Sequence, residues 1–133
     1  METIEEKNRM IAEFMGFKPE KTVVNVAQPS GYTKAKNVIA YQVEAKRTDG
    51  ITNLTHDYML KYHTSWDWLM PVVIYINVNT EHTFVIQAMD CYVYNVNNGK
   101  QVTQPSMKYQ PSELINSVYE TVIEFIEMYN QKN

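Results

Sequence analysis

The feature that most constrains this chain is the run Tyr62–Val73, which holds both tryptophans of the protein two positions apart. Thr64 or Ser65 can cap a helix here, because a hydroxyl accepts hydrogen bonds from the free amides of the first turn, and Asp67 meets the positive end of the helix dipole. A tryptophan ring supplies a large share of the buried area of a small domain. The run therefore predicts a helix from Thr64 or Ser65 to about Tyr75, with both indoles in the core.

A proline in this run leaves a second interpretation open. Pro71 falls inside the predicted helix, where it lacks the N–H for the helical hydrogen bond and its ring should bend the chain. In the alternative, a turn carries the two tryptophans and Val72–Val78 forms a strand. We favour the helix.

Two further helices are predicted at the ends of the chain. Thr3 and Glu6 form a capping box for a helix over Thr3–Met15, which a glycine then ends. Ser112 caps a second helix that runs to about Gln131, with one apolar stripe and glutamates on its other faces.

Strand-like segments fill the rest of the chain. β-Branched residues or period-two alternation mark four segments, of which the last two are separate strands or one long bent strand: Lys21–Gln28, Asn37–Arg47, Thr83–Ala88 and Cys91–Val96. Turns are predicted at 29–31, 49–50 and 97–99, and the segments 51–60 and Gln101–Tyr109 fit either a strand or irregular structure. The prediction is an α+β fold, in which a mainly antiparallel sheet of four or five strands is layered with the N-terminal, central and C-terminal helices, like an α-β-α sandwich.

Composition limits the class of protein. The chain has 133 residues without a low-complexity break, which predicts one domain over 1–133. Its formal net charge of −3 makes nucleic acid an unfavourable partner. Cys91 is the only cysteine, so no intramolecular disulfide can form, and a reducing, cytoplasmic location is expected. No apolar stretch is long enough to span a membrane, and no signal-type segment precedes the first helix.

Three stretches resemble a group of small proteins from phages and mobile elements of Bacteroides-type bacteria that carry a phage α-β-α sandwich domain. The stretches are 8–16, 60–73 and 118–130, and the most specific string is Trp66-Asp67-Trp68-Leu69-Met70-Pro71. The resemblance implies a layered α/β fold and a phage or prophage origin in a bacterial host cell. It implies no activity.

The residues offer few candidates for catalysis. His63 and Asp67 are four positions apart, as an acid/base pair could be, although both also fit as residues that decorate a helix N-terminus. The other histidines have no zinc-ligand spacing, so no metal and no cofactor are predicted. Cys91 lies in a strand-like setting and is interpreted as a small core residue rather than a nucleophile.

One loose group of basic and aromatic residues is a candidate binding surface. Its weak candidates are Tyr32, Lys34, Lys36, Tyr41 and Trp66, of which the first four fall in a predicted hairpin over 32–47. Charge and stacking of this kind suit single-stranded nucleic acid, whereas ordinary surface lysines would look the same in a sequence.

Three function hypotheses follow. The leading one is a non-enzymatic accessory protein of a phage or mobile element that acts through contacts with a phage or host protein or as a homo-oligomer, because chemistry is sparse and ten tyrosines and eight methionines suit interfaces. The second is a single-stranded nucleic-acid-binding module that uses the 32–47 hairpin. The third is a small hydrolase or transferase that uses His63 and Asp67.

Overall fold

The computed structural model describes residues 2–42, 55–87, 90–104, 106–107 and 114–132. In these ranges three α-helices, a 3-10 turn and six strands follow one another along the chain. They are α1 (Ile4–Phe14), β1 (Pro19–Ala27), β2 (Thr33–Tyr41), β3 (Thr55–His56), η1 (Asp57–Met59), α2 (Trp66–Asn79), β4 (His82–Ile86), β5 (Asp90–Asn95), β6 (Ser106–Met107) and α3 (Leu114–Lys132).

Helix α1 begins and ends as its sequence predicts. The Thr3 hydroxyl accepts a hydrogen bond from the amide of Glu6 at 3.1 Å. At the other end Gly16 takes a φ of 92°, in the left-handed region that glycine enters without steric cost. The amide of Phe17 then returns to the carbonyl of Ala12 at 3.0 Å and closes the helix.

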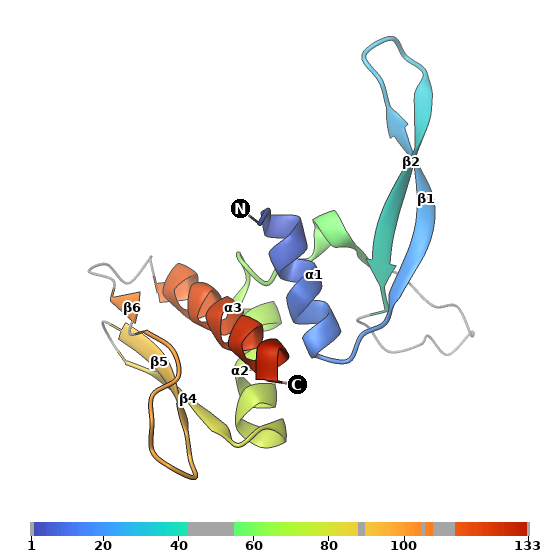
Figure 1. Cartoon of the computed structure of the whole chain (residues 1–133). Helices are drawn as coiled ribbons and strands as arrows, with labels where there is room; N and C mark the ends of the chain where they lie inside the picture. Colours follow the sequence, from blue (N-terminus) through green and yellow to red (C-terminus); the bar gives the residue numbers. More distant parts are fainter. Residues whose placement is uncertain (1, 43–54, 88–89, 105, 108–113, 133) are drawn as a thin grey trace.

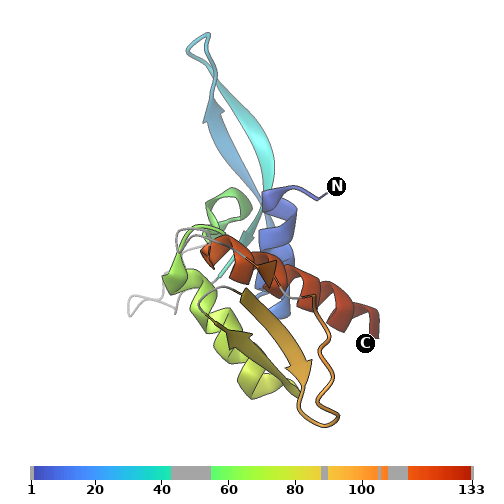
Figure 2. The ribbon, with the colours of Figure 1, turned by 90° about the vertical axis from the view of Figure 1, so that its left-hand side faces the viewer.

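The strands form two antiparallel sheets, in the orders β1-β2-β3 and β4-β5-β6. In the first sheet β1 and β2 pair along their full length, from Pro19 opposite Tyr41 to Ala27 opposite Thr33. The third strand of this sheet pairs only with the base of β2, at Ala40 and Tyr41. The β1–β2 hairpin therefore leaves the body of the molecule as a long arm, which both perpendicular views display (Figures 1 and 2).

The core lies among the helices and the second sheet. Leu69, Val72 and Ile76 of α2 are fully buried, as are Val118, Val122 and other residues on one stripe of α3. Helix α3 contacts β5, β6 and α1, and α2 contacts β4. Phe14 of α1 meets the rings of Tyr75, Phe125 and Tyr129 edge-on, so one aromatic cluster links all three helices.

The α+β class and the antiparallel pairing are confirmed, whereas a single sheet of four or five strands is not, because the described strands divide between two sheets. The central helix is confirmed and continues through Pro71 to Asn79, so a strand over Val72–Val78 is wrong. The second predicted strand is displaced: it runs over Thr33–Tyr41 instead of starting at Asn37. Its predicted end, 43–47, lies outside the described residues, as do the turn at 49–50 and the helix cap at Ser112.

The two tryptophans differ from the prediction. Trp68 is partly buried against the core and meets the ring of Tyr62 edge-on, with centroids 5.3 Å apart. Trp66 is 39% exposed at the first turn of α2, so its placement in the core is wrong. The aliphatic residues that follow the tryptophans anchor this segment instead.

Candidate functional site

The most distinctive surface is the arm formed by β1, β2 and the turn between them. The amide of Gln28 donates to the carbonyl of Tyr32 at 2.8 Å, and the amide of Gly31 donates to the carbonyl of Gln28 at 3.0 Å. Gly31 has a φ of 88°, and Pro29 supplies the fixed φ that suits the second position of a turn. The predicted turn at 29–31 is thereby confirmed as the tip of the arm.

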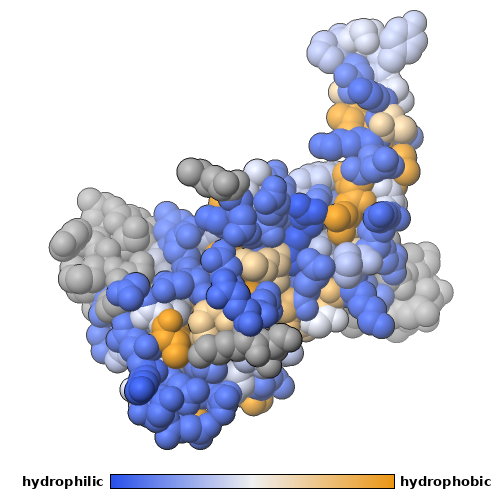
Figure 3. All heavy atoms as spheres, viewed as in Figure 1, coloured by the Kyte–Doolittle hydropathy of each residue, from blue (hydrophilic) through white to orange (hydrophobic). Residues whose placement is uncertain are grey.

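Apolar side chains are exposed along this arm. Val23 is 59% exposed, Val26 38% and Tyr32 79%, although β-branched and aromatic residues in strands normally pack against a neighbour. Figure 3 shows hydrophobic residues alternating with hydrophilic ones along the arm. Apolar surface left open on a projecting element is a typical feature of an interaction site.

The arm also carries the opposite charge to the whole chain. Its two strands contain Lys21, Lys34 and Lys36 against the single acidic residue Glu20, while the chain has a formal net charge of −3. The register pairs Val24 with Lys36 and Val26 with Lys34. Since directly opposed residues share a face, one side of the arm combines valines with the two lysines.

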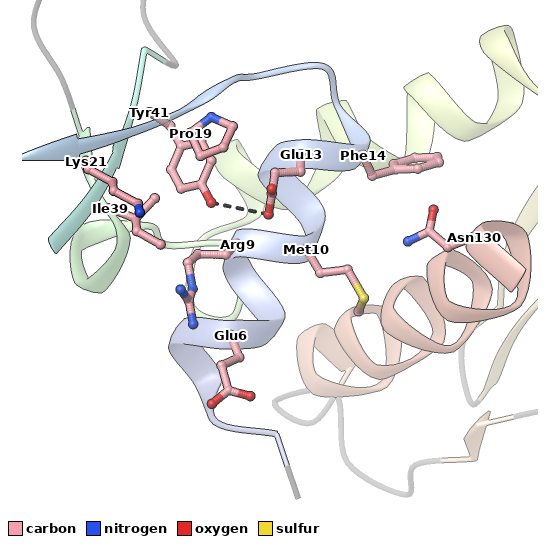
Figure 4. A pocket seen from close by; sticks show the side chains of 10 residues that line it. All are labelled: Glu6, Arg9, Met10, Glu13, Phe14, Pro19, Lys21, Ile39, Tyr41 and Asn130. Atoms are coloured by element: carbon pink, nitrogen blue, oxygen red, sulfur yellow. Dashed lines mark hydrogen bonds between the residues drawn. The ribbon is translucent and has the colours of Figure 1, made fainter. Parts of the chain in front are cut away.

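A cleft of about 630 Å³ opens where the arm meets α1 and the end of α3. It is lined by Glu6, Arg9, Met10, Glu13, Phe14, Pro19, Lys21, Ile39, Tyr41 and Asn130. Figure 4 shows the hydroxyl of Tyr41 directed at the carboxylate of Glu13, to which it donates at 3.4 Å. Burial of the ring and the negative charge of Glu13 raise the pKa of Tyr41 well above its usual range, so this hydroxyl stays protonated and acts as a donor.

The cleft contains charges of both signs. The guanidinium Nε of Arg9 lies 3.9 Å from a carboxylate oxygen of Asp57, which is an ion pair without a hydrogen bond. A nucleophile within hydrogen-bond reach of a base is what acyl or group transfer requires. The only hydrogen bond drawn between the lining residues joins a tyrosine to a carboxylate (Figure 4). The arrangement can hold the arm against α1 and can bind a polar group.

A second polar site lies in the body around Asn8, a buried residue of α1. Its side-chain amide nitrogen lies 3.0 Å from the carbonyl of Leu60 and 3.0 Å from Nδ1 of His63. The hydroxyl of Tyr119 donates to its amide oxygen at 2.9 Å. Because a carbonyl can only accept, the NH₂ group must face Leu60, and His63 Nδ1 therefore accepts a hydrogen bond.

This network assigns His63 a structural task and argues against the predicted acid/base pair. Nδ1 of His63 accepts a hydrogen bond from Asn8, and the centroid of the His63 ring lies 6.1 Å from that of Tyr119. Asp67 is exposed in the first turn of α2, and no hydrogen bond or ion pair joins these two described residues. His63 and Asp67 thus fit the alternative in which they decorate the helix start.

The candidate binding residues separate into three groups. Tyr32, Lys34 and Lys36 are exposed together on the arm, as the hairpin hypothesis requires, although the hairpin spans 19–41 rather than 32–47. Tyr41 is fully buried at the base of the arm, so its assignment as a stacking residue is wrong. Trp66 lies in the body at the start of α2, away from the arm (Figure 1).

The only cysteine of the chain lies in the core where β5 meets α3. Cys91 is buried with its sulfur 3.1 Å from the hydroxyl of Thr121 and 3.3 Å from that of Ser117. The Thr121 hydroxyl already donates to the Ser117 carbonyl, so it accepts from the thiol. Among the residues that the structure describes, no group of three or more His, Cys, Asp or Glu side chains could hold a metal ion.

Sequence reasoning missed Asn8 and the exposed edge of the arm. A signal for Asn8 was present, because it shares a helical face with Ile4, Ile11 and Ala12 and so interrupts an apolar stripe with an amide. A polar residue on a buried stripe must find partners. For Val23 and Val26 the sequence showed only strand propensity, which does not distinguish a buried strand from an exposed one.

Comparison with family models, with curated proteins and with solved structures found no match to this chain. In the described ranges, no helix has both the length and the apolar character that crossing a membrane demands.

Proposed function

We propose that this chain is a non-enzymatic accessory protein that acts through protein–protein contacts made by the β1–β2 arm. The observation that carries the proposal is the exposure of Val23, Val26 and Tyr32 on an element that projects from the body. Exposure of such residues to water is unfavourable, and a partner that buries them gains the free energy of removing their apolar surface from water. The resemblance of residues 60–73 supports a phage or mobile element as the setting.

The chemistry of the body supports the same function. The histidine that offered an acid/base role is a hydrogen-bond acceptor for Asn8, and the only cysteine is buried against two hydroxyls. The cleft at the base of the arm pairs a protonated tyrosine with Glu13. These contacts serve to fix the arm and the helices.

Site-specific photocrosslinking tests the proposal. A photoreactive residue replaces Tyr32 at the tip of the arm, and in a matched variant it replaces Asn98 in the exposed turn that follows β5. We expect protein adducts at position 32 and none above background at position 98 when the variants are produced in bacterial host cells. Equal labelling at the two positions, or none at either, would contradict the proposal.

A second candidate function is binding of single-stranded nucleic acid by the same arm. It is favoured by Tyr32, Lys34 and Lys36, which combine an exposed ring with positive charge. Salt-dependent binding of a labelled oligonucleotide, lost in the double variant Lys34→Glu/Lys36→Glu, would support it. Absence of binding at low salt removes it.

A further inference from the structure

The outer edge of β1 is an open template for strand pairing. The hydrogen bond from Gln28 to Tyr32 fixes which residues of the hairpin exchange backbone bonds, because bonded and non-bonded pairs alternate along an antiparallel ladder. By this alternation the N–H and C=O groups of Lys21, Val23, Asn25 and Ala27 point away from β2. In the described part of the chain no strand pairs with this edge.

Pro19, Glu20 and Lys21 at the base of β1 are of the kinds that protect exposed edges, whereas the rest of the strand lacks such residues. The segment Thr22–Ala27 has no charge and no proline, and its valines are partly or largely exposed. Long, uncharged, β-branched edges pair readily with another strand. A two-stranded ribbon alone is also marginally stable in water, so a further strand would stabilise the arm.

We infer that the partner of this edge is β1 of a second copy of the chain, paired antiparallel across a two-fold axis at Val23. The inference rests on the proposed function and names its partner. An axis at Val23 is the one register that aligns all nine residues of the strand, since Pro19 then faces Ala27 of the other copy. An axis at Lys21 would oppose two lysines, which is destabilising, and an axis at Asn25 would shorten the overlap.

Charge supports the same register. Glu20 of one copy then lies beside Val26 of the other, and the register within the hairpin puts Lys34 on the far side of that valine. The two opposite charges share a face and are two strand spacings apart, about 9.6 Å between backbones, which long side chains can bridge over a valine. No like charges oppose each other directly in this arrangement.

The length of the arm sets the distance between the two bodies in this pair. An arm of nine residues per strand extends about 30 Å at 3.4 Å per residue, so antiparallel pairing keeps the two bodies at opposite ends of a four-stranded ribbon. The tip of each arm then lies beside Phe17 and Lys18 of the other copy. The β2-β1-β1-β2 order leaves β3 in place on each β2.

Light scattering over a range of concentrations tests this inference. The wild type should approach twice the 15.6 kDa of one chain. Val23→Lys places two ammonium groups directly opposite each other and should raise the dissociation constant at least about tenfold. Asn37→Lys is the matched control, because Asn37 is exposed on the same face beside Val23 but is three strand spacings, about 14 Å, from its copy.

Cysteine crosslinking tests the register. In a bonded pair the Cα atoms are about 5.5 Å apart, within the range of a disulfide, so Val23→Cys should form a covalent dimer on mild oxidation. Asn37→Cys should not, and the native Cys91 is buried and does not compete.

A monomeric wild type at high concentration, or a Val23→Lys variant that dimerises like the control, would overturn the inference. The proposed function is tested independently of the dimer. Adducts between position 32 and other proteins would support it even if the chain were monomeric.

Discussion

Asn8 shows how one polar side chain can hold three segments of a chain together. It belongs to α1, and its partners are the carbonyl of Leu60, the ring of His63 and the hydroxyl of Tyr119 on α3. A buried amide costs free energy unless its hydrogen bonds are made, and here both ends of the amide have partners. The network therefore specifies how α1, α3 and the segment before α2 fit together.

Removal of this amide should destabilise the fold. Asn8→Ala leaves the Leu60 carbonyl and the Tyr119 hydroxyl buried without their partner, which should lower the free energy of unfolding by about 1–3 kcal/mol. Asn116→Ala, on the exposed side of α3, makes the same change in a helix and should alter it by no more than about 0.5 kcal/mol. Urea denaturation followed by circular dichroism measures both. Equal effects in the two variants would refute the structural role of Asn8.

Helix α2 is the element with the clearest internal conflict. Pro71 lies within Trp66–Asn79, where it cannot donate to the carbonyl of the residue four positions earlier. The helix persists because its buried residues pack against the core and so outweigh the lost bond. Pro71 itself is exposed, so no packing is lost when it changes.

Pro71→Ala should therefore raise the free energy of unfolding by about 1–3 kcal/mol, because alanine restores the N–H and removes the ring clash. Pro29→Ala is the matched control, and it should change the free energy of unfolding in the opposite direction. Pro29 lies in the turn of the arm, where its fixed φ lowers the entropy of the unfolded chain, and its loss should destabilise by about 0.4–1 kcal/mol. Thermal unfolding of the two variants measures the contrast, and a destabilised Pro71→Ala would contradict it.

Local signals predicted elements better than they predicted pairing. The helix cap at Thr3, the turn at 29–31 and the stripe of α3 depend on residues close in sequence, and all three are present in the described residues. The start of β2 at Thr33 was missed because its first residues lack alternation and become a strand by pairing with β1. Division into two sheets and the projection of the arm depend on contacts between distant residues, which periodicity does not encode.

At the scale of the whole molecule the core and the arm are separate in position and in charge. Residues of all three helices, of β4 and of β5 share one hydrophobic cluster, to which the first sheet contributes mainly through Tyr41 and Ile39 at its base. Beyond that base the arm is exposed and carries two lysines, Lys34 and Lys36, and no acidic residue. Surface changes on the arm can therefore alter contacts without altering the core.

Buried tyrosines distributed over the body make the stability of the whole chain sensitive to high pH. Burial raises the pKa of Tyr62 from its ordinary value of 10.0 to about 12, and it also raises the pKa values of Tyr41 and Tyr119. These groups hold their protons more tightly in the folded chain than in the unfolded one. Their stabilising contribution is complete below pH 10 and is lost as the pH rises through the folded pKa.

We therefore expect the free energy of unfolding to fall steeply between pH 10 and 12. Tyr62→Phe should reduce this slope by up to about 1.4 kcal/mol per pH unit, because the variant has no proton to lose at that position. Tyr32→Phe is the control, because it makes the same chemical change on a ring that is exposed in the folded chain. Denaturant titrations at about pH 9, 10.5 and 11.5, which lie on both sides of the ordinary tyrosine pKa, measure the slopes. Equal slopes for Tyr62→Phe and the wild type would show that Tyr62 keeps its ordinary pKa in the folded chain.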